Sequence, residues 1–128
     1  MGEAQASIGI DRGADEVWTV VGDFAGIGWM AGIDSVTVDG DDRTLQTMGL
    51  EIVEHLISRD DEARAITYGI VGGSLPVESH EATITVVPAG ESCTVTWDVA
   101  VEPDGLTAIM EQTYQGALKA LKERLEAE

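Results

Sequence analysis

The stretch that decides the fold of this chain is its C-terminal end, which reads LTAIMEQTYQGALKALKERLEAE over residues 106–128. Its apolar residues recur at spacings of three and four, which predicts one long amphipathic helix. The stripe consists of Leu106, Met110, Tyr114, Ala117, Leu121 and Leu125, widened by Ile109, Thr113 and Leu118. A helix of about 20 residues is about 30 Å long. One such helix cannot fill the concave face of a long curved sheet, so we expect a hollow between them.

Most of the chain between residues 34 and 102 is predicted to be β-strand. Alternating apolar and polar residues predict strands at 6–10, 36–38, 44–48, 50–59, 63–71, 77–88 and 92–102. The short turns between them indicate antiparallel neighbours. After the first strand, Asp15 is a plausible N-cap of a short helix, and residues 25–32 predict a second short helix or turn. We therefore predict an α+β fold, a curved seven-stranded antiparallel sheet wrapped around the C-terminal helix, with two short helices after strand 1.

Composition limits the classes of partner. A length of 128 residues predicts one domain over residues 1–128. The net charge of −17 argues against nucleic acid and anionic membrane surfaces, and it would fit an acidic bacterial protein. No apolar run approaches membrane-spanning length, and no charged-then-apolar leader opens the chain. Cys93 is the single cysteine, which excludes an intrachain disulfide and suits a reducing cytoplasm. We expect a cytoplasmic monomer or weak homodimer.

The strand period assigns polar side chains to faces of the predicted sheet. His80 shares its face with apolar neighbours and is expected to point inward, as are Tyr68 and Trp97. One strand is ambiguous, because both of its faces are apolar and either Glu54 or His55 can face the interior. The two histidines are expected on opposite sides of the sheet, so we predict no metal site, and no phosphate-binding loop or other cofactor motif is present.

Short sequence motifs similar to those of one known protein superfamily are spread over nearly the whole chain. Near the N-terminus they are Val17-Trp18, Asp23-Phe24 and Trp29, followed by Glu54-His55-Leu56, Ala65-Ile66-Thr67-Tyr68, Leu75-Pro76-Val77 and Val95-Thr96-Trp97. Together they resemble the START/helix-grip (SRPBCC) superfamily, which includes polyketide cyclase/dehydrase-like proteins. The resemblance implies the same order of elements as the residue patterns. Because this fold hosts both carriers and enzymes, it does not fix the function.

The plant abscisic acid receptors are a similar subgroup, and the resemblance implies which positions line a pocket. Carried over by position, these are Glu54, Tyr68, His80 and Ala82 on the sheet and Ile109, Thr113 and Ala117 on the helix. This favours Glu54 over His55 as the inward residue. The receptors' carboxylate-binding lysine falls at Met30, so a carboxylate ligand would lose its cation. No gate motif is recognisable near residues 48–50, and hormone reception is therefore not implied.

The leading functional hypothesis is binding of a hydrophobic small molecule, such as a lipid, polyketide or aromatic compound, in the predicted hollow. The expected lining consists of Trp29, Met30, Glu54, Tyr68, Leu75, Pro76, His80, Ala82, Trp97, Ile109, Met110, Thr113 and Ala117. The alternative is a polyketide cyclase or dehydratase that uses Glu54, His80 and Tyr68 as acid-base groups. A third hypothesis is a partner-binding domain without a small ligand, which an exposed apolar rim around Leu75 and Pro76 would favour.

Overall fold

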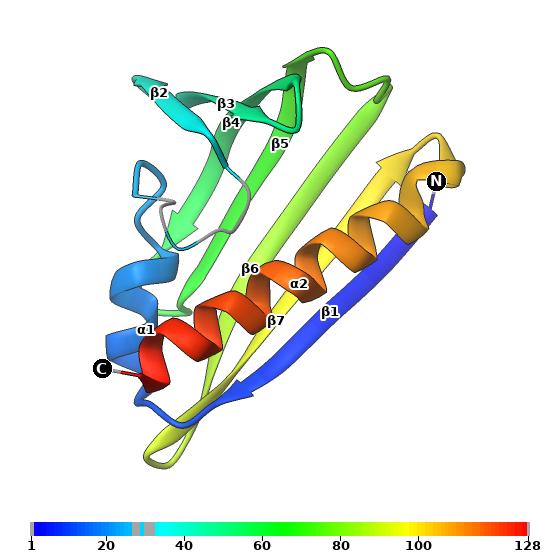
Figure 1. Cartoon of the computed structure of the whole chain (residues 1–128). Coiled ribbons are helices and arrows are strands. Elements are labelled where there is room, and N and C mark those ends of the chain that lie inside the picture. The colour runs from blue at the N-terminus through cyan, green and yellow to red at the C-terminus, as the bar shows by residue number, and fades with distance from the viewer. Residues whose placement is uncertain (1, 27–28, 30–32, 128) are drawn as a thin grey trace.

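The computed structural model, shown in Figure 1, describes residues 2–26, 29 and 33–127. Its strands are β1 (Gly2–Ile10), β2 (Ser35–Asp39), β3 (Asp42–Thr47), β4 (Leu50–Asp60), β5 (Ala65–Gly73), β6 (Ser79–Ala89) and β7 (Ser92–Glu102). Its helices are α1 (Ala14–Val21), the 3₁₀ turn η1 (Asp104–Leu106) and α2 (Thr107–Glu126). The strands form one antiparallel sheet in the order β1-β7-β6-β5-β4-β3-β2. This confirms the predicted α+β helix-grip fold.

The long helix does not cover the sheet evenly. It runs along β1 and β7 at one edge, while β5, β4 and β3 curve away from it (Figure 1). The short helix α1 lies near the C-terminus of α2 and closes that end of the groove between α2 and the sheet. The space between α2 and the far half of the sheet is therefore bounded by helix on one side and by strands on the other.

The chain between α1 and β2 differs from the sequence prediction. Its described residues form turns and bends rather than a second short helix, and the remaining positions of that predicted helix, 27–28 and 30–32, lie outside the described residues. A tight turn closes with the Gly26 amide donating to the Asp23 carbonyl at 3.1 Å. A Cβ atom at Gly26 would lie 2.5 Å from Asp23 Oδ2, so a larger residue here would require the Asp23 side chain to move.

The apolar core is concentrated where α1, the C-terminal half of α2 and the central strands meet. Val17, Val95, Leu118 and Leu121 have no measurable exposure. Leu118 and Leu121 continue the stripe read from the C-terminal sequence, and these four side chains fill the groove at this end.

Strands β5 and β6 are paired over only part of their lengths. Within the described strands these two pair from Ala65 to Tyr68 and then separate, whereas β6 and β7 pair along their full lengths. Gly69 lies at the point of divergence, where a Cβ atom would approach the His80 carbonyl oxygen to 2.6 Å. We call this junction the β5–β6 seam. It leaves the backbone of β5 beyond Tyr68 without a β6 partner.

Candidate functional site

The hollow expected from the long helix is present as a cavity of about 280 Å³ between α2 and strands β3, β4 and β5. Most of its lining is apolar, and its polar residues come from β3, β4, β5 and α2, namely Thr47, Glu54, Tyr68, Thr113 and Tyr114. The lining residues are Ile33, Leu45, Thr47, Met48, Leu50, Ile52, Glu54, Tyr68, Ile70, Leu75, Ile109, Met110, Thr113, Tyr114 and Ala117. Met48 and Ile109 are 83% and 59% exposed, so the cavity opens to solvent beside them.

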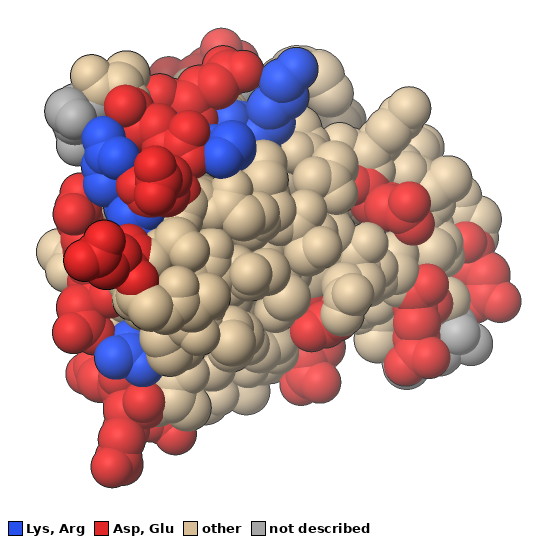
Figure 2. Space-filling model, turned by 90° about the horizontal axis from the view of Figure 1, so that it is seen from below, with Lys and Arg blue, Asp and Glu red and all other residues tan. Residues whose placement is uncertain are grey.

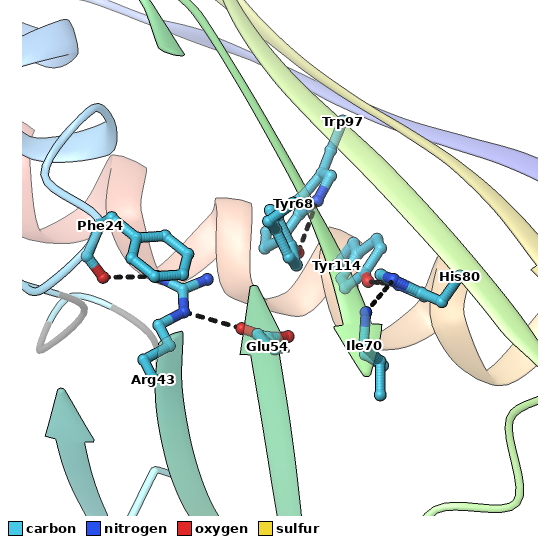
Figure 3. Close-up of polar contacts among 8 residues, drawn as sticks. All are labelled: Phe24, Arg43, Glu54, Tyr68, Ile70, His80, Trp97 and Tyr114. Carbon is cyan, nitrogen blue, oxygen red and sulfur yellow. Dashed lines mark hydrogen bonds and ion pairs between the residues drawn. The ribbon is translucent and has the colours of Figure 1, made fainter. Parts of the chain in front are cut away.

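A buried ion pair forms part of the cavity wall. The Arg43 guanidinium donates to Glu54 Oε1 at 2.8 Å and to the Phe24 carbonyl at 2.7 Å (Figure 3). The same guanidinium lies 4.1 Å from the centre of the Phe24 ring, in cation–π contact. Burial raises the pKa of Glu54, and the charge and hydrogen bond of Arg43 oppose that rise. Glu54 is thus a carboxyl group held at a cavity wall in an environment that favours its protonation.

A second polar cluster surrounds Tyr114. The Ile70 amide donates to His80 Nδ1 at 3.2 Å, and His80 Nε2 is bonded to the Tyr114 hydroxyl at 2.7 Å (Figure 3). Burial lowers the pKa of His80 to about 4, so its ring is neutral at pH 7. The His80 ring therefore accepts a hydrogen bond from the Ile70 amide at the β5–β6 seam, where the backbone of β5 has no partner on β6.

The two tyrosines of the lining are held by buried neighbours. Trp97 Nε1 donates to the Tyr68 hydroxyl at 3.1 Å, and the Trp97 ring stacks on Tyr114 with ring centres 4.0 Å apart. Burial raises the pKa of Tyr68 well above its usual range and also raises that of Tyr114. Both phenols are therefore protonated at neutral pH.

Comparison with known proteins identifies the family. Residues 1–126 match the family described as polyketide cyclase/dehydrase and lipid transport. The chain belongs to this family. That match confirms the resemblance to START/SRPBCC proteins read from the sequence motifs. No curated protein sequence matches the chain.

Solved structures of several proteins are similar to this chain. The Bacillus cereus protein XoxI is 27% identical, with a TM-score of 0.91 and coverage of 97% of this chain and 95% of that one. The di-domain ARO/CYC protein BexL of the BE-7585A biosynthetic pathway is 21% identical, with a TM-score of 0.82 and coverage of 98% and 47%. Norcoclaurine synthase from Thalictrum flavum is 20% identical, with a TM-score of 0.76 and coverage of 98% and 87%. The last two support the fold alone.

Seven of the predicted pocket residues line this family member's cavity. They are Glu54, Tyr68, Leu75, Ile109, Met110, Thr113 and Ala117. Glu54 is buried while His55 is exposed, which resolves the strand that the alternation left open. The two line opposite faces of β4, and register shifts interrupt its pairing with β5 after Val53 and after Leu56.

The other predicted pocket residues lie elsewhere. His80, Ala82 and Trp97 are buried behind the lining, and Trp29 packs against Trp97 with ring centres 6.0 Å apart. Pro76 is exposed beside the cavity residue Leu75. Met30 lies outside the described residues. The prediction of facing was right for His80, Ala82 and Trp97, but an inward residue need not reach the cavity when a larger neighbour stands in front of it.

Sequence reasoning missed Arg43 and underused Tyr114. Arg43 precedes the strand predicted at residues 44–48, whereas β3 begins at Asp42 and places Arg43 on the same face as Leu45. Extending the alternation back by two residues from Leu45 would have found it. Tyr114 was assigned to the helix stripe for packing, and its hydroxyl is one of the polar groups of the cavity.

Three further findings concern the described residues. No group of three or more His, Cys, Asp or Glu among them is close enough to hold a metal ion. No described helix is long and apolar enough to span a membrane. Cys93 is buried, and burial raises the pKa of its thiol, which makes it a poor nucleophile at neutral pH.

Proposed function

We propose that this family member binds a hydrophobic small molecule in the cavity between α2 and strands β3 to β5. The observation that carries the proposal is a cavity of about 280 Å³ with a mainly apolar lining that includes a few polar residues. Ligand pockets for small molecules are commonly about 300–1,000 Å³. The volume here is near the lower limit, which favours a compact aromatic or polyketide-like ring system over a long acyl chain.

The entrance supports this proposal. Met48 and Ile109 present large apolar side chains to solvent on either side of the opening, one from the β3–β4 turn and one from α2. Methionine is flexible and polarisable, so it adapts to apolar ligands of different shapes. An apolar rim lowers the cost of transferring a hydrophobic ligand from water into the cavity.

The surface charge argues for a neutral or cationic ligand rather than an anionic one. In the face shown in Figure 2, Asp and Glu side chains lie around the edges, with Lys and Arg beside them at one end. Five of the seven basic residues form ion pairs with carboxylates, namely Arg12, Arg43, Arg59, Arg64 and Lys122.

The absence of nucleic-acid partners, the cytoplasmic location and the monomeric or weakly dimeric state stay predictions.

A blocked cavity tests the proposal. The substitution Ala117→Phe places a ring in the lining, and Gln112→Phe places the same ring on the exposed face of α2 as the matched control. We expect apolar aromatic compounds to raise the melting temperature of the wild type and of Gln112→Phe, but not of Ala117→Phe. Native mass spectrometry of freshly purified protein checks for a retained ligand. Equal responses of the two variants would place binding outside this cavity.

A second candidate function is enolisation of a bound carbonyl compound, the first step of cyclase and dehydratase chemistry. The observation that favours it is Glu54, a carboxyl of raised pKa in the same lining as Tyr68. Ionised Glu54 would take the proton from the carbon next to the carbonyl, and a tyrosine hydroxyl would donate to the enolate oxygen. His80 does not fit the acid-base role we predicted, because both ring nitrogens are engaged and it stands behind Tyr114.

Hydrogen–deuterium exchange at the carbon next to the carbonyl separates the enzyme from the binder. We expect a bound ketone in D₂O to exchange this proton faster with the wild type than with Glu54→Gln, as followed by NMR. If both proteins bind the ketone and neither accelerates exchange, the protein is a binder and the enolisation candidate is wrong.

A further inference from the structure

Two tyrosines from different elements line the cavity, and their hydroxyls are hydrogen-bonded to the buried residues Trp97 and His80. Tyr68 comes from β5 and Tyr114 from α2, and both line the cavity although each ring is at least nine-tenths buried. A phenol can either donate or accept a hydrogen bond. Which of these each tyrosine offers to a ligand depends on what its buried neighbours already use.

Trp97 sets the direction of the hydrogen bond at the Tyr68 hydroxyl. An indole N–H can only donate, so the 3.1 Å bond from Trp97 Nε1 must be accepted by the Tyr68 oxygen. Trp97 has no measurable exposure and cannot turn away without disrupting its stack on Tyr114. The accepting side of the Tyr68 hydroxyl is thus occupied from behind, and its proton remains for another partner.

His80, which is bonded to the Ile70 amide at the seam, sets the direction of the hydrogen bond at the Tyr114 hydroxyl. The backbone amide of Ile70 donates to Nδ1, so Nδ1 carries no proton. The neutral ring must then carry its proton on Nε2, which donates to the Tyr114 oxygen at 2.7 Å. Tyr114 is therefore also an acceptor toward the protein interior, and its own proton is directed elsewhere.

Counting the protons of the two hydroxyls shows how many hydrogen bonds they can donate. The two hydroxyls together hold two protons and receive two further hydrogen bonds from Trp97 and His80. If one tyrosine donates to the other, a single O–H remains for the cavity; with a ligand that accepts from both, two remain. The bonds from Trp97 and His80 therefore use neither of the two hydroxyl protons.

We infer that Tyr68 and Tyr114 form a paired-hydroxyl donor site for the carbonyl oxygen of a neutral, mainly apolar ligand, with Trp97 and His80 as positioning residues that fix the direction of both hydrogen bonds. The inference rests on the proposed binding function and adds the ligand class: ketones, quinones or esters are preferred to hydrocarbons of the same shape. A carbonyl oxygen has two lone pairs and can accept from both hydroxyls at once.

A matched pair of probes tests this inference. The ketone 1-tetralone and the hydrocarbon tetralin have nearly the same shape and differ by one C=O in place of CH₂. For each protein variant, the ratio of their dissociation constants, measured by calorimetry, cancels general changes in the hydrophobicity of the cavity. We expect Tyr68→Phe and Tyr114→Phe each to reduce the preference for the ketone about threefold to tenfold, and the double variant to reduce it further.

The matched control is Thr19→Val, which removes an exposed hydroxyl from α1 at a position outside the cavity lining. We expect its ratio to equal that of the wild type. Binding of both probes with the same ratio in the wild type and the double variant would overturn the donor site and leave the binding function standing. Failure of both probes to bind the wild type at their solubility limits would count against the binding function as well.

The positioning role of His80 has its own readout. Glutamine keeps an N–H donor near the place of Nε2, whereas phenylalanine offers none. We expect His80→Gln to retain the ketone preference and His80→Phe to lose part of it, although both remove the imidazole. Equal ratios in these two variants would show that His80 does not direct the Tyr114 hydroxyl.

Discussion

The two halves of α2 meet the same sheet with opposite results. In the C-terminal half, Leu118, Leu121 and Leu125 are buried and fill the groove against the core. In the N-terminal half, Ile109 and Thr113 are exposed at the mouth of a cavity. The apolar stripe is continuous along the helix, so periodicity does not distinguish the halves. The difference arises from side-chain volume and from which strands lie opposite.

The strands opposite each half explain why one end is packed and the other open. The packed end faces the core strands and is closed by α1. The open end faces β3 to β5, and β5 diverges from β6 at the seam. The polar residues Glu54, Tyr68 and Tyr114 line the cavity at this end. Four experiments test this division, in order of decreasing expected effect.

The largest effect is expected from breaking the buried ion pair of the open end. Arg43→Met leaves Glu54 buried without its cation, which costs about 3–5 kcal/mol in the free energy of unfolding, measured by urea denaturation at pH 7. Arg59→Met, which breaks an exposed pair with Asp61, is the matched control and should cost less than about 1 kcal/mol. Similar small losses in both variants would mean that the open end does not depend on this pair.

The next effect compares the two halves of α2 directly. Leu121→Ala removes a fully buried side chain from the packed half and should cost about 3 kcal/mol. Ile109→Ala removes an exposed side chain from the open half and should change stability by less than about 1 kcal/mol. Chemical denaturation of both variants checks this, and a large loss at position 109 would show that the open half is packed in solution.

The seam should make stability depend on pH through His80. Burial lowers the pKa of His80 to about 4 from an unfolded value of 6.5, so between these values the unfolded chain binds a proton that the folded protein does not. The contribution of His80 to the free energy of unfolding is fully present above pH 6.5. It is lost as the pH falls toward 4, by a total of about 3 kcal/mol. The reference is His80→Gln, whose stability should fall less over the same window. Parallel pH profiles for the two proteins would contradict the assignment.

The smallest effects come from enlarging an alanine in each environment. Ala82 is fully buried behind the lining, and Ala82→Leu should cost about 2 kcal/mol through overpacking. Ala117 faces the cavity, so Ala117→Leu should change stability by less than about 1 kcal/mol while reducing the binding of apolar ligands. Thermal unfolding with and without an aromatic ligand measures both, and equal destabilisation would remove the distinction between the two alanines.

The sequence predicted the elements well because the features that specify them are local. Alternation and turns located the strands, and the three-four spacing located α2, although β1 begins at Gly2 rather than at residue 6. The second short helix was wrong in its described part, because Gly26 closes a turn there. Glu54 could be chosen over His55 only through the family resemblance, since both faces of its strand are apolar.

The site was less predictable because it depends on contacts between distant segments. Arg43 and Glu54 are neighbours through the register of β3 and β4, which alternation within one strand does not reveal. His80 was correctly placed inward, but its role depends on the amide of Ile70, which is free only because β5 and β6 separate. Periodicity assigns a face, whereas depth behind that face depends on the volumes of the neighbours.

The seam also divides the sheet into two plates. One plate is β1, β7 and β6, which carries α2, and the other is β5, β4, β3 and β2, which carries most of the strand side of the cavity. They share a short hinge of four residue pairs, from Ala65↔Thr85 to Tyr68↔Ala82. We expect a change in the angle between the plates to widen or narrow the cavity while the leucines of α2 stay packed. We expect ligands of different girth to be accommodated by this hinge, with the rotation registered first at the Ile70–His80 contact.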